Sequence, residues 1–186
     1  MRKHYGMRKI QFFEINFTSK ISDFIRIVNT FTTIKPTKKT MINVHYFAFN
    51  GFQENTYILF DDTKECVIID PGCYSNEEQQ VLTNYISENG LTPIKLLNTH
   101  CHIDHILGNN FVATKYNVGL EMHEKDLPTL HATPEYGHTF GFNVDKSPEP
   151  TTLLDEGDIV KFGNSELSVL FTPGHSAGHI VFVSHQ

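Results

Sequence analysis

The chain has 186 residues, which is enough for one domain with a buried core. Its hydrophobic content is ordinary for a globular protein, and no stretch approaches the ~20 consecutive apolar residues of a membrane span. The three cysteines, Cys66, Cys73 and Cys101, are too few and too odd in number for a disulfide framework. We therefore expect a reducing, cytoplasmic setting and no membrane partner.

Charge divides the chain into two parts. Residues 1–40 hold nine Lys/Arg and two Asp/Glu, a net of +7, whereas residues 41–186 hold six Lys/Arg and nineteen Asp/Glu, a net of −13; together they give the −6 of the whole chain. Because the larger part is strongly acidic, it is poorly suited to a phosphate backbone. The charge distribution therefore disfavours a nuclease, and we expect no nucleic-acid partner.

The basic residues 1–40 form an N-terminal extension that we expect to lie outside the fold, since Met41 opens a run of strand-like sequence. Their apolar residues at 21, 24, 25 and 28 have helical spacing and allow one short amphipathic helix. Two alternatives are a basic targeting or membrane-surface arm and an extension that packs on the domain.

Residues 41–186 predict a mixed α/β domain without internal repeats. Ser75 and Glu78 have the spacing of a helical capping box and Gly90 suits the end of that helix, and a second helix is predicted at about 106–116. Residues 131–152 are rich in Pro, Gly, Thr and His and predict a long loop. Strands are predicted at 44–49, 56–60, 66–70, 94–97, 118–122, 159–162, 166–171 and 180–184.

A dense run of metal-ligand residue types follows the predicted strand at 94–97. In Thr-His-Cys-His-Ile-Asp-His, residues 99–105, His100 and His102 are two apart, so in extended backbone both side chains point the same way. Asp104 and His105 follow where the chain turns into a helix, within reach of a second ion. Imidazole and carboxylate are ordinary ligands of zinc, iron and manganese. The spacing predicts a metal site, in which Cys101 points away from the ions.

A second histidine-bearing loop lies near the end of the chain. In Thr-Pro-Gly-His-Ser-Ala-Gly-His, residues 172–179, His175 stands at the apex between two predicted strands. Together with His100 and His102 it would complete a three-histidine site with open positions for water. That arrangement is typical of a catalytic rather than a structural metal site. His179 is expected to have a structural role in the loop.

These motifs resemble the metal-binding signatures of the metallo-β-lactamase superfamily, and the form of the second loop is similar to its glyoxalase II (hydroxyacylglutathione hydrolase) branch. The segment from Val67 to Gly72 resembles an earlier motif of that family. The resemblance covers residues 41–186 and implies an αββα sandwich with two metals at one edge of its sheets. It implies that His100, His102 and His175 hold the first metal, that Asp104 and His105 bind the second, and that Asp70 orients a ligating imidazole.

The resemblance is incomplete at the C-terminus. The family continues with a Gly-Asp motif whose Asp bridges both metals and with a further His, and neither follows His175 in this sequence. We therefore expect a C-terminally truncated fold, with three ligands present for the first metal and two for the second.

The family resemblance implies a metal-dependent hydrolase that cleaves a small thioester through hydroxide formed from metal-bound water. Two Zn²⁺ ions are expected, with Fe or Mn as alternatives, and Asp104 is the expected catalytic residue, which ligates, orients and accepts a proton. The alternatives are a mononuclear-iron persulfide dioxygenase and a metal-binding fragment that is inactive because it lacks the bridging Asp. The sequence leaves the exact substrate and the oligomeric state open.

Overall fold

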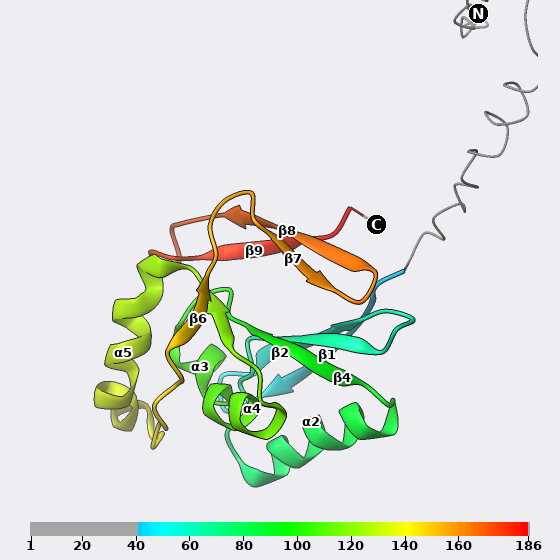
Figure 1. Ribbon diagram of the computed structural model, residues 1–186. Coiled ribbons are helices and arrows are strands. Elements are labelled where there is room, and N and C mark those ends of the chain that lie inside the picture. The colour runs from blue at the N-terminus through cyan, green and yellow to red at the C-terminus, as the bar shows by residue number, and fades with distance from the viewer. Residues whose placement is uncertain (1–40, 186) are drawn as a thin grey trace, which may run out of the picture. The chain divides into compact units, whose positions relative to one another are not determined.

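The computed structural model describes residues 41–185, which all belong to one compact unit, Lys39–Gln186 (Figure 1). The basic extension and the amphipathic helix predicted within it lie outside the described residues. Within 41–185, no helix combines the length and the hydropathy that a membrane span requires.

A six-stranded sheet forms the centre of this unit, with strands in the order β1-β2-β3-β4-β5-β6. The first three strands pair antiparallel, and β3 to β6 pair parallel. The strands are β1 (Asn43–Phe49), β2 (Glu54–Phe60), β3 (Glu65–Ile69), β4 (Thr92–Leu97), β5 (Leu120–Met122) and β6 (Pro150–Leu153). The carboxyl ends of the parallel strands share one edge, which is where ligands bind in open α/β sheets.

A second, antiparallel sheet of three strands lies against one face of the first (Figure 1). It consists of β7 (Ile159–Phe162), β8 (Ser165–Phe171) and β9 (Ile180–Val183). Its inward side chains, such as Val160 and Leu167, form one hydrophobic cluster with Val67 and Leu97 of the large sheet. The loop between β8 and β9 is thereby fixed relative to the end of β4.

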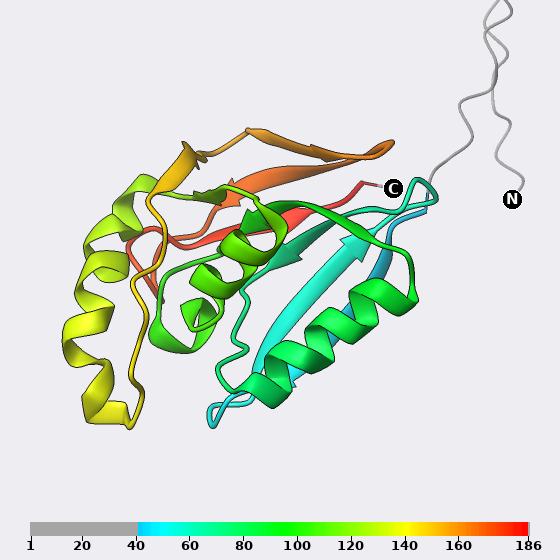
Figure 2. The same cartoon turned by 60° about the horizontal axis from the view of Figure 1, so that its bottom comes forward.

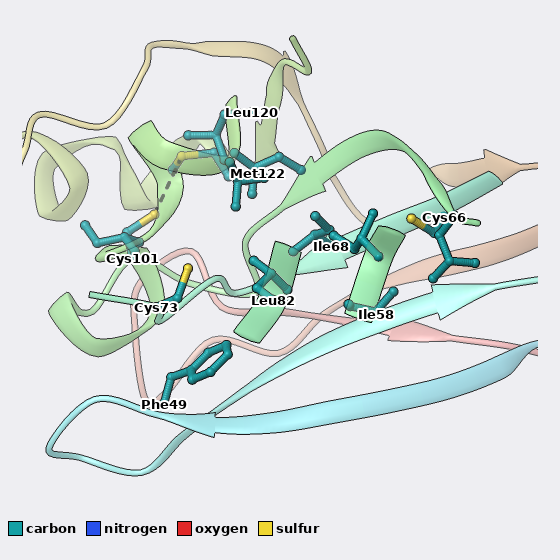
Figure 3. Packing of buried hydrophobic residues seen from close by; sticks show 14 of the residues in the cluster. Phe49, Ile58, Cys66, Ile68, Cys73, Leu82, Cys101, Leu120 and Met122 are labelled. Carbon is teal, nitrogen blue, oxygen red and sulfur yellow. Dashed lines mark hydrogen bonds between the residues drawn. The ribbon is translucent and has the colours of Figure 1, made fainter. Parts of the chain in front are cut away.

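Helices cover the opposite face of the large sheet (Figure 2). Buried residues of α2 and α4, among them Leu82 and Val112, pack with Ile58, Ile68 and Leu96 of the sheet (Figure 3). The helices are α2 (Asn76–Glu88), α3 (Ile103–Ile106), α4 (Asn109–Tyr116) and α5 (Leu127–Tyr136), with short 3-10 helices η1 (Glu124–Asp126) and η2 (Gly137–Phe140). Because β3 is covered on both faces, its whole apolar run is buried, as the sequence predicted.

The layers confirm the predicted α/β class and the stacked sheets of the expected αββα sandwich, and in residues 41–185 the helices cover the large sheet. Local signals also hold, because Ser75 accepts a hydrogen bond from Glu78 N while Glu78 accepts one from Ser75 N, which forms the predicted capping box. Gly90 follows α2 with a φ of +62°, a left-handed conformation that glycine adopts without strain.

The single helix predicted at 106–116 is wrong in detail, since the chain forms two helices, α3 and α4, that meet at Leu107 and Gly108. The Gly108 N–H donates to Pro71 O at 2.7 Å instead of to a helical carbonyl. A Cβ at Gly108 would lie 2.6 Å from the Cys73 Sγ, so only glycine fits this close approach. The break turns the residues after His102 back towards the end of β3.

The long loop predicted at 131–152 is also wrong over most of its length. Helix α5 continues to Tyr136, η2 follows it, and β6 begins at Pro150. Pro128 lies in the first turn of α5, where no N–H partner is needed, and Thr133 Oγ1 donates to Thr129 O within the helix. Pro134, in contrast, lies inside α5, where proline lacks the N–H that a helix uses, so this residue ordinarily signals a helix end. Leu130 is buried on its inner side.

Candidate metal centre

Three histidines from separate parts of the chain converge at the edge where β4 ends. His100 follows β4, His102 is the residue before α3, and His175 lies in the loop between β8 and β9. One nitrogen from each lies within 4.8 Å of the others, and His102 Nδ1 is 3.0 Å from His175 Nε2. The group therefore joins a loop of the large sheet to a loop of the small sheet.

The three imidazoles differ in their exposure to solvent. His100 is buried, His102 is half-buried and His175 is exposed. His100 Nε2 is a buried nitrogen without a hydrogen-bond partner, which is costly unless another group occupies its lone pair. The group is thus buried at His100 and exposed at His175.

Asp70 and Thr99 fix the orientation of His100. Asp70 Oδ1 accepts from Thr99 N at 2.7 Å, and Asp70 Oδ2 accepts from Thr99 Oγ1 at 2.5 Å. Thr99 Oγ1 also lies 3.0 Å from His100 Nδ1. Because the hydroxyl gives its only proton to the carboxylate, it can only accept from His100 Nδ1–H. This chain of hydrogen bonds leaves the lone pair of His100 on Nε2, the free nitrogen of the group.

Burial keeps the deeper imidazoles neutral. Burial, together with a smaller contribution from the neighbouring His105, lowers the pKa of His100 to about 3. Burial also lowers the pKa of His102, with a second contribution from His175. Neutral imidazole is the form that binds a metal ion. His100 and His102 can therefore bind one at neutral pH without first releasing a proton.

A second group of potential ligand atoms combines Asp70, His100 and His105, also within 4.8 Å of one another. His105 Nδ1 lies 3.1 Å from Asp70 Oδ2, although without the angle of a hydrogen bond, and His105 Nε2 lies 3.4 Å from Asp104 Oδ2. Burial lowers the pKa of His105, but the carboxylates of Asp70 and Asp104 outweigh it and raise the pKa above its ordinary value. This side of the centre is acidic, in contrast to the three-histidine side.

Asp104 lies beside His105 but outside both groups of converging ligand atoms in the described residues. Its backbone carbonyl accepts a hydrogen bond from Asn50 Nδ2 at 3.0 Å, which ties the turn between β1 and β2 to the metal loop. The structure thus brings together His100, His102 and His175, and separately His105 with Asp70 and Asp104. The ligand and catalytic roles of these residues stay predictions.

Sequence reasoning missed a buried carboxyl group next to the centre. Glu54, at the start of β2, accepts from Thr56 Oγ1, while its Oε1 is buried without a partner 3.8 Å from His105 Nδ1. Burial and the nearby Asp70 raise the pKa of Glu54 to about 9, so this group is neutral at pH 7. A signal existed, since residue 54 shares the inward face of β2 with Thr56 and Ile58, where an acid is unusual.

Two neighbours of the ligands have structural surroundings. The Cys101 thiol points into the core, 3.6 Å from Met122 Sδ, as the alternation of residues 100–102 predicted (Figure 3). His179 Nδ1 lies 3.1 Å from the backbone oxygen of Thr172 and from its hydroxyl, at the base of the loop that carries His175. These contacts agree with the structural role predicted for His179.

The residues present fit a borderline divalent cation. They offer neutral imidazole nitrogens, one of them buried and unpaired, and carboxylates on the adjoining side. Such mixed nitrogen and oxygen donors suit zinc, iron and manganese better than magnesium or calcium, which prefer oxygen ligands alone.

Comparison with known proteins agrees with this geometry. Residues 49–186 match the family model described as the metallo-beta-lactamase superfamily. The chain belongs to the metallo-beta-lactamase superfamily. This membership accounts for the two histidine-bearing loops and for the stacked sheets that carry them.

Relatives within the superfamily include two proteins named hydroxyacylglutathione hydrolase. The one from Haemophilus influenzae, named GloC, is 33% identical over 78% of this chain and 68% of its own length. That of an Enterobacter species (strain 638) is 34% identical over 76% of this chain and 47% of its own length. The solved structure of TTHA1623 in a di-iron-bound form is 29% identical, with a TM-score of 0.64 over 75% of this chain and 66% of that one. These likenesses support a metal-dependent hydrolase.

The chain spans about half to two thirds of the length of these relatives. The activity of the whole protein is therefore a matter for proposal.

Proposed function

We propose that the protein is a metal-dependent hydrolase of small thioesters, of the hydroxyacylglutathione hydrolase type. The observation that carries this proposal is the convergence of His100, His102 and His175 around an unpaired, buried nitrogen. The names of the relatives from Haemophilus influenzae and Enterobacter support the thioester as the substrate class.

The proposed roles follow the two sides of the centre. His100, His102 and His175 would hold one metal ion, and Asp104 with His105 would help to hold a second. When bound, such ions acidify a coordinated water and polarise a substrate carbonyl. We propose zinc as the resident metal, with iron as an alternative that the di-iron form of TTHA1623 supports.

The protein's own groups would orient these ligands and receive the substrate. Asp70 accepts a hydrogen bond from Thr99, whose hydroxyl in turn contacts the ring of His100. The same carboxylate also lies beside the ring of His105. Asp104 is half-buried beside His105, where its carboxylate can accept a proton from an attacking water. The exposed side of His175 is the open approach for the thioester.

The test is an assay with the chain loaded separately with Zn²⁺, Fe²⁺ and Mn²⁺, and with any longer product of its gene, on S-lactoylglutathione and other acyl thioesters. We expect release of a carboxylic acid and a thiol by the metal-loaded protein, and none from the His100→Ala variant. Stoichiometric metal without turnover on any thioester would refute the proposal. One iron per chain with oxygen uptake would favour the persulfide dioxygenase instead.

A further inference from the structure

Asp126 is a buried carboxylate that contacts both metal-binding loops. Its side chain is 1% exposed and lies at the junction of η1 and α5. One carboxylate oxygen, Oδ2, accepts from Cys101 N at 2.8 Å. The other, Oδ1, accepts from Ser176 Oγ at 2.5 Å and from Gly178 N at 2.7 Å. Asp126 therefore receives three hydrogen bonds, all from residues next to the histidines.

The division of these bonds between the two oxygens is informative. Cys101 stands between His100 and His102, whereas Ser176 and Gly178 flank His175 on its C-terminal side. The two loops are more than seventy residues apart in sequence and belong to different sheets. A single carboxylate thus sets the separation between the pair His100/His102 and the third imidazole.

The position of Asp126 shows that these bonds replace an ordinary local role. Asp126 is the residue before α5, where an aspartate usually accepts a hydrogen bond from its own helix, yet its side chain makes no such cap bond. The loop in turn approaches Asp126 closely: a Cβ at Gly178 would lie 2.6 Å from Asp126 N and 2.9 Å from Asp126 Cβ. Only glycine at 178 allows the contact.

We infer that Asp126 is a positioning residue of the metal centre, which holds the loop of His175 against the loop of His100 and His102 so that the three imidazoles can bind one ion. This inference rests on the proposed metal centre. Asp126 touches none of the three imidazole nitrogens in the hydrogen bonds above, so it acts through the backbone of both loops.

The test compares Asp126→Ala, Asp126→Asn and Ser176→Ala with the parent chain, each as the full 186 residues. Asp61→Asn is the matched control, because Asp61 is equally buried and accepts bonds from Thr63, Asn164 and Ser165 far from the histidines. Zn²⁺ affinity is measured by chelator competition, and the coordination of Co²⁺ by its visible absorption.

We expect both Asp126 variants to weaken Zn²⁺ binding by about 10–100-fold, the usual effect of removing a partner that orients ligands, and to alter the Co²⁺ spectrum. Ser176→Ala should have a smaller effect because Gly178 N still reaches Oδ1. Asp61→Asn should leave both readouts at parent values. Parent-like Zn²⁺ affinity and Co²⁺ spectrum in both Asp126 variants would overturn the inference, and if Asp126→Ala does not fold, Asp126→Asn decides.

A metal-free measurement separates this inference from the proposed function. In the apo protein, amide hydrogen exchange at Cys101 and Gly178 should be slow in the parent and in Asp61→Asn, and fast in Asp126→Ala and Asp126→Asn. If the parent binds no metal, the proposed function fails, while the exchange data still decide whether Asp126 holds the loops together. Unchanged exchange at both amides in the Asp126 variants would overturn the inference on its own.

Discussion

Each end of β2 has a buried carboxyl group, but the two groups differ in how many hydrogen-bond partners the protein gives them. Past one end, Asp61 is 1% exposed, and its two oxygens accept bonds from Thr63, Asn164 and Ser165. At the other end, Glu54 and the nearby His100 and His105 each have a buried polar atom without a hydrogen-bond partner. The carboxylate of Asp61 is fully satisfied by the protein, whereas three of the five buried side-chain polar atoms without a partner in residues 41–185 lie around His100, where a ligand would complete them.

The largest effect should come from removing the most buried imidazole. His100→Ala deletes the unpaired Nε2, so we expect Zn²⁺ affinity to fall by more than about 100-fold, beyond the effect of losing a partner that only orients a ligand. Competition with a chromophoric chelator measures it. His138→Ala is the control, because His138 is exposed on η2 and outside both ligand groups. Equal affinity in the two variants would remove His100 from the centre.

A smaller loss is expected when only the orientation of His100 is disturbed. Thr99→Val keeps the shape of the side chain but removes the hydroxyl between Asp70 and His100 Nδ1. We expect Zn²⁺ affinity to fall about 10–100-fold, with recovery in Thr99→Ser, which retains the hydroxyl. Isothermal titration of the three proteins would show this. A valine variant that binds as tightly as the parent would mean that packing alone orients the ring.

Replacing Asp61, at the opposite end of β2, should lower the stability of the fold and leave metal binding unchanged. Burial raises the pKa of Asp61, but the hydrogen bonds from Thr63, Ser165 and Asn164 outweigh it and lower the pKa below its ordinary value. Its stabilising contribution is therefore present above the unfolded-state pKa and is lost as the pH falls through the folded-state pKa. Asp61→Asn should lower the free energy of unfolding by about 1–3 kcal/mol at pH 7.

Urea unfolding of parent and Asp61→Asn between pH 2 and pH 7 tests the sign. The difference in stability should shrink at the acidic end, because the parent then loses the same contribution. A constant difference across this range would show that the charge on Asp61 contributes nothing.

Much of the fold followed from local patterns, and the failures have physical reasons. The strands from Val44 to Leu97 and the capping box at Ser75 are local signals, and the structure agrees with them. The break at Gly108 depends on a hydrogen bond to Pro71, which lies 37 residues earlier, and no periodicity reports such a partner. The loop predicted at 131–152 is wrong where α5 continues to Tyr136, because Pro134 inside the helix is ordinarily a breaker and local composition does not report the burial of Leu130.

The candidate site shows the same division. His100, His102 and His175, which the structure brings together, could be proposed as ligands because histidines stand close together in sequence within each loop. The ligand roles of Asp104 and His105 stay predictions. Asp126 could not be found in this way, since its partners at 101, 176 and 178 are distant in sequence and two of them donate through the backbone. Groups that orient a site through main-chain contacts leave no mark in the motif that they serve.

The close approach at Gly178 has a practical consequence for redesign. A library meant to change the substrate range would sample His175's loop freely, yet any side chain at 178 would push the loop off Asp126. Diversity belongs instead at the exposed aromatic residues of the turn after β1 and of η2, Phe52 and Phe140, whose rings lie 6.0 Å apart. Neither residue is among the hydrogen-bond partners of Asp126 named above.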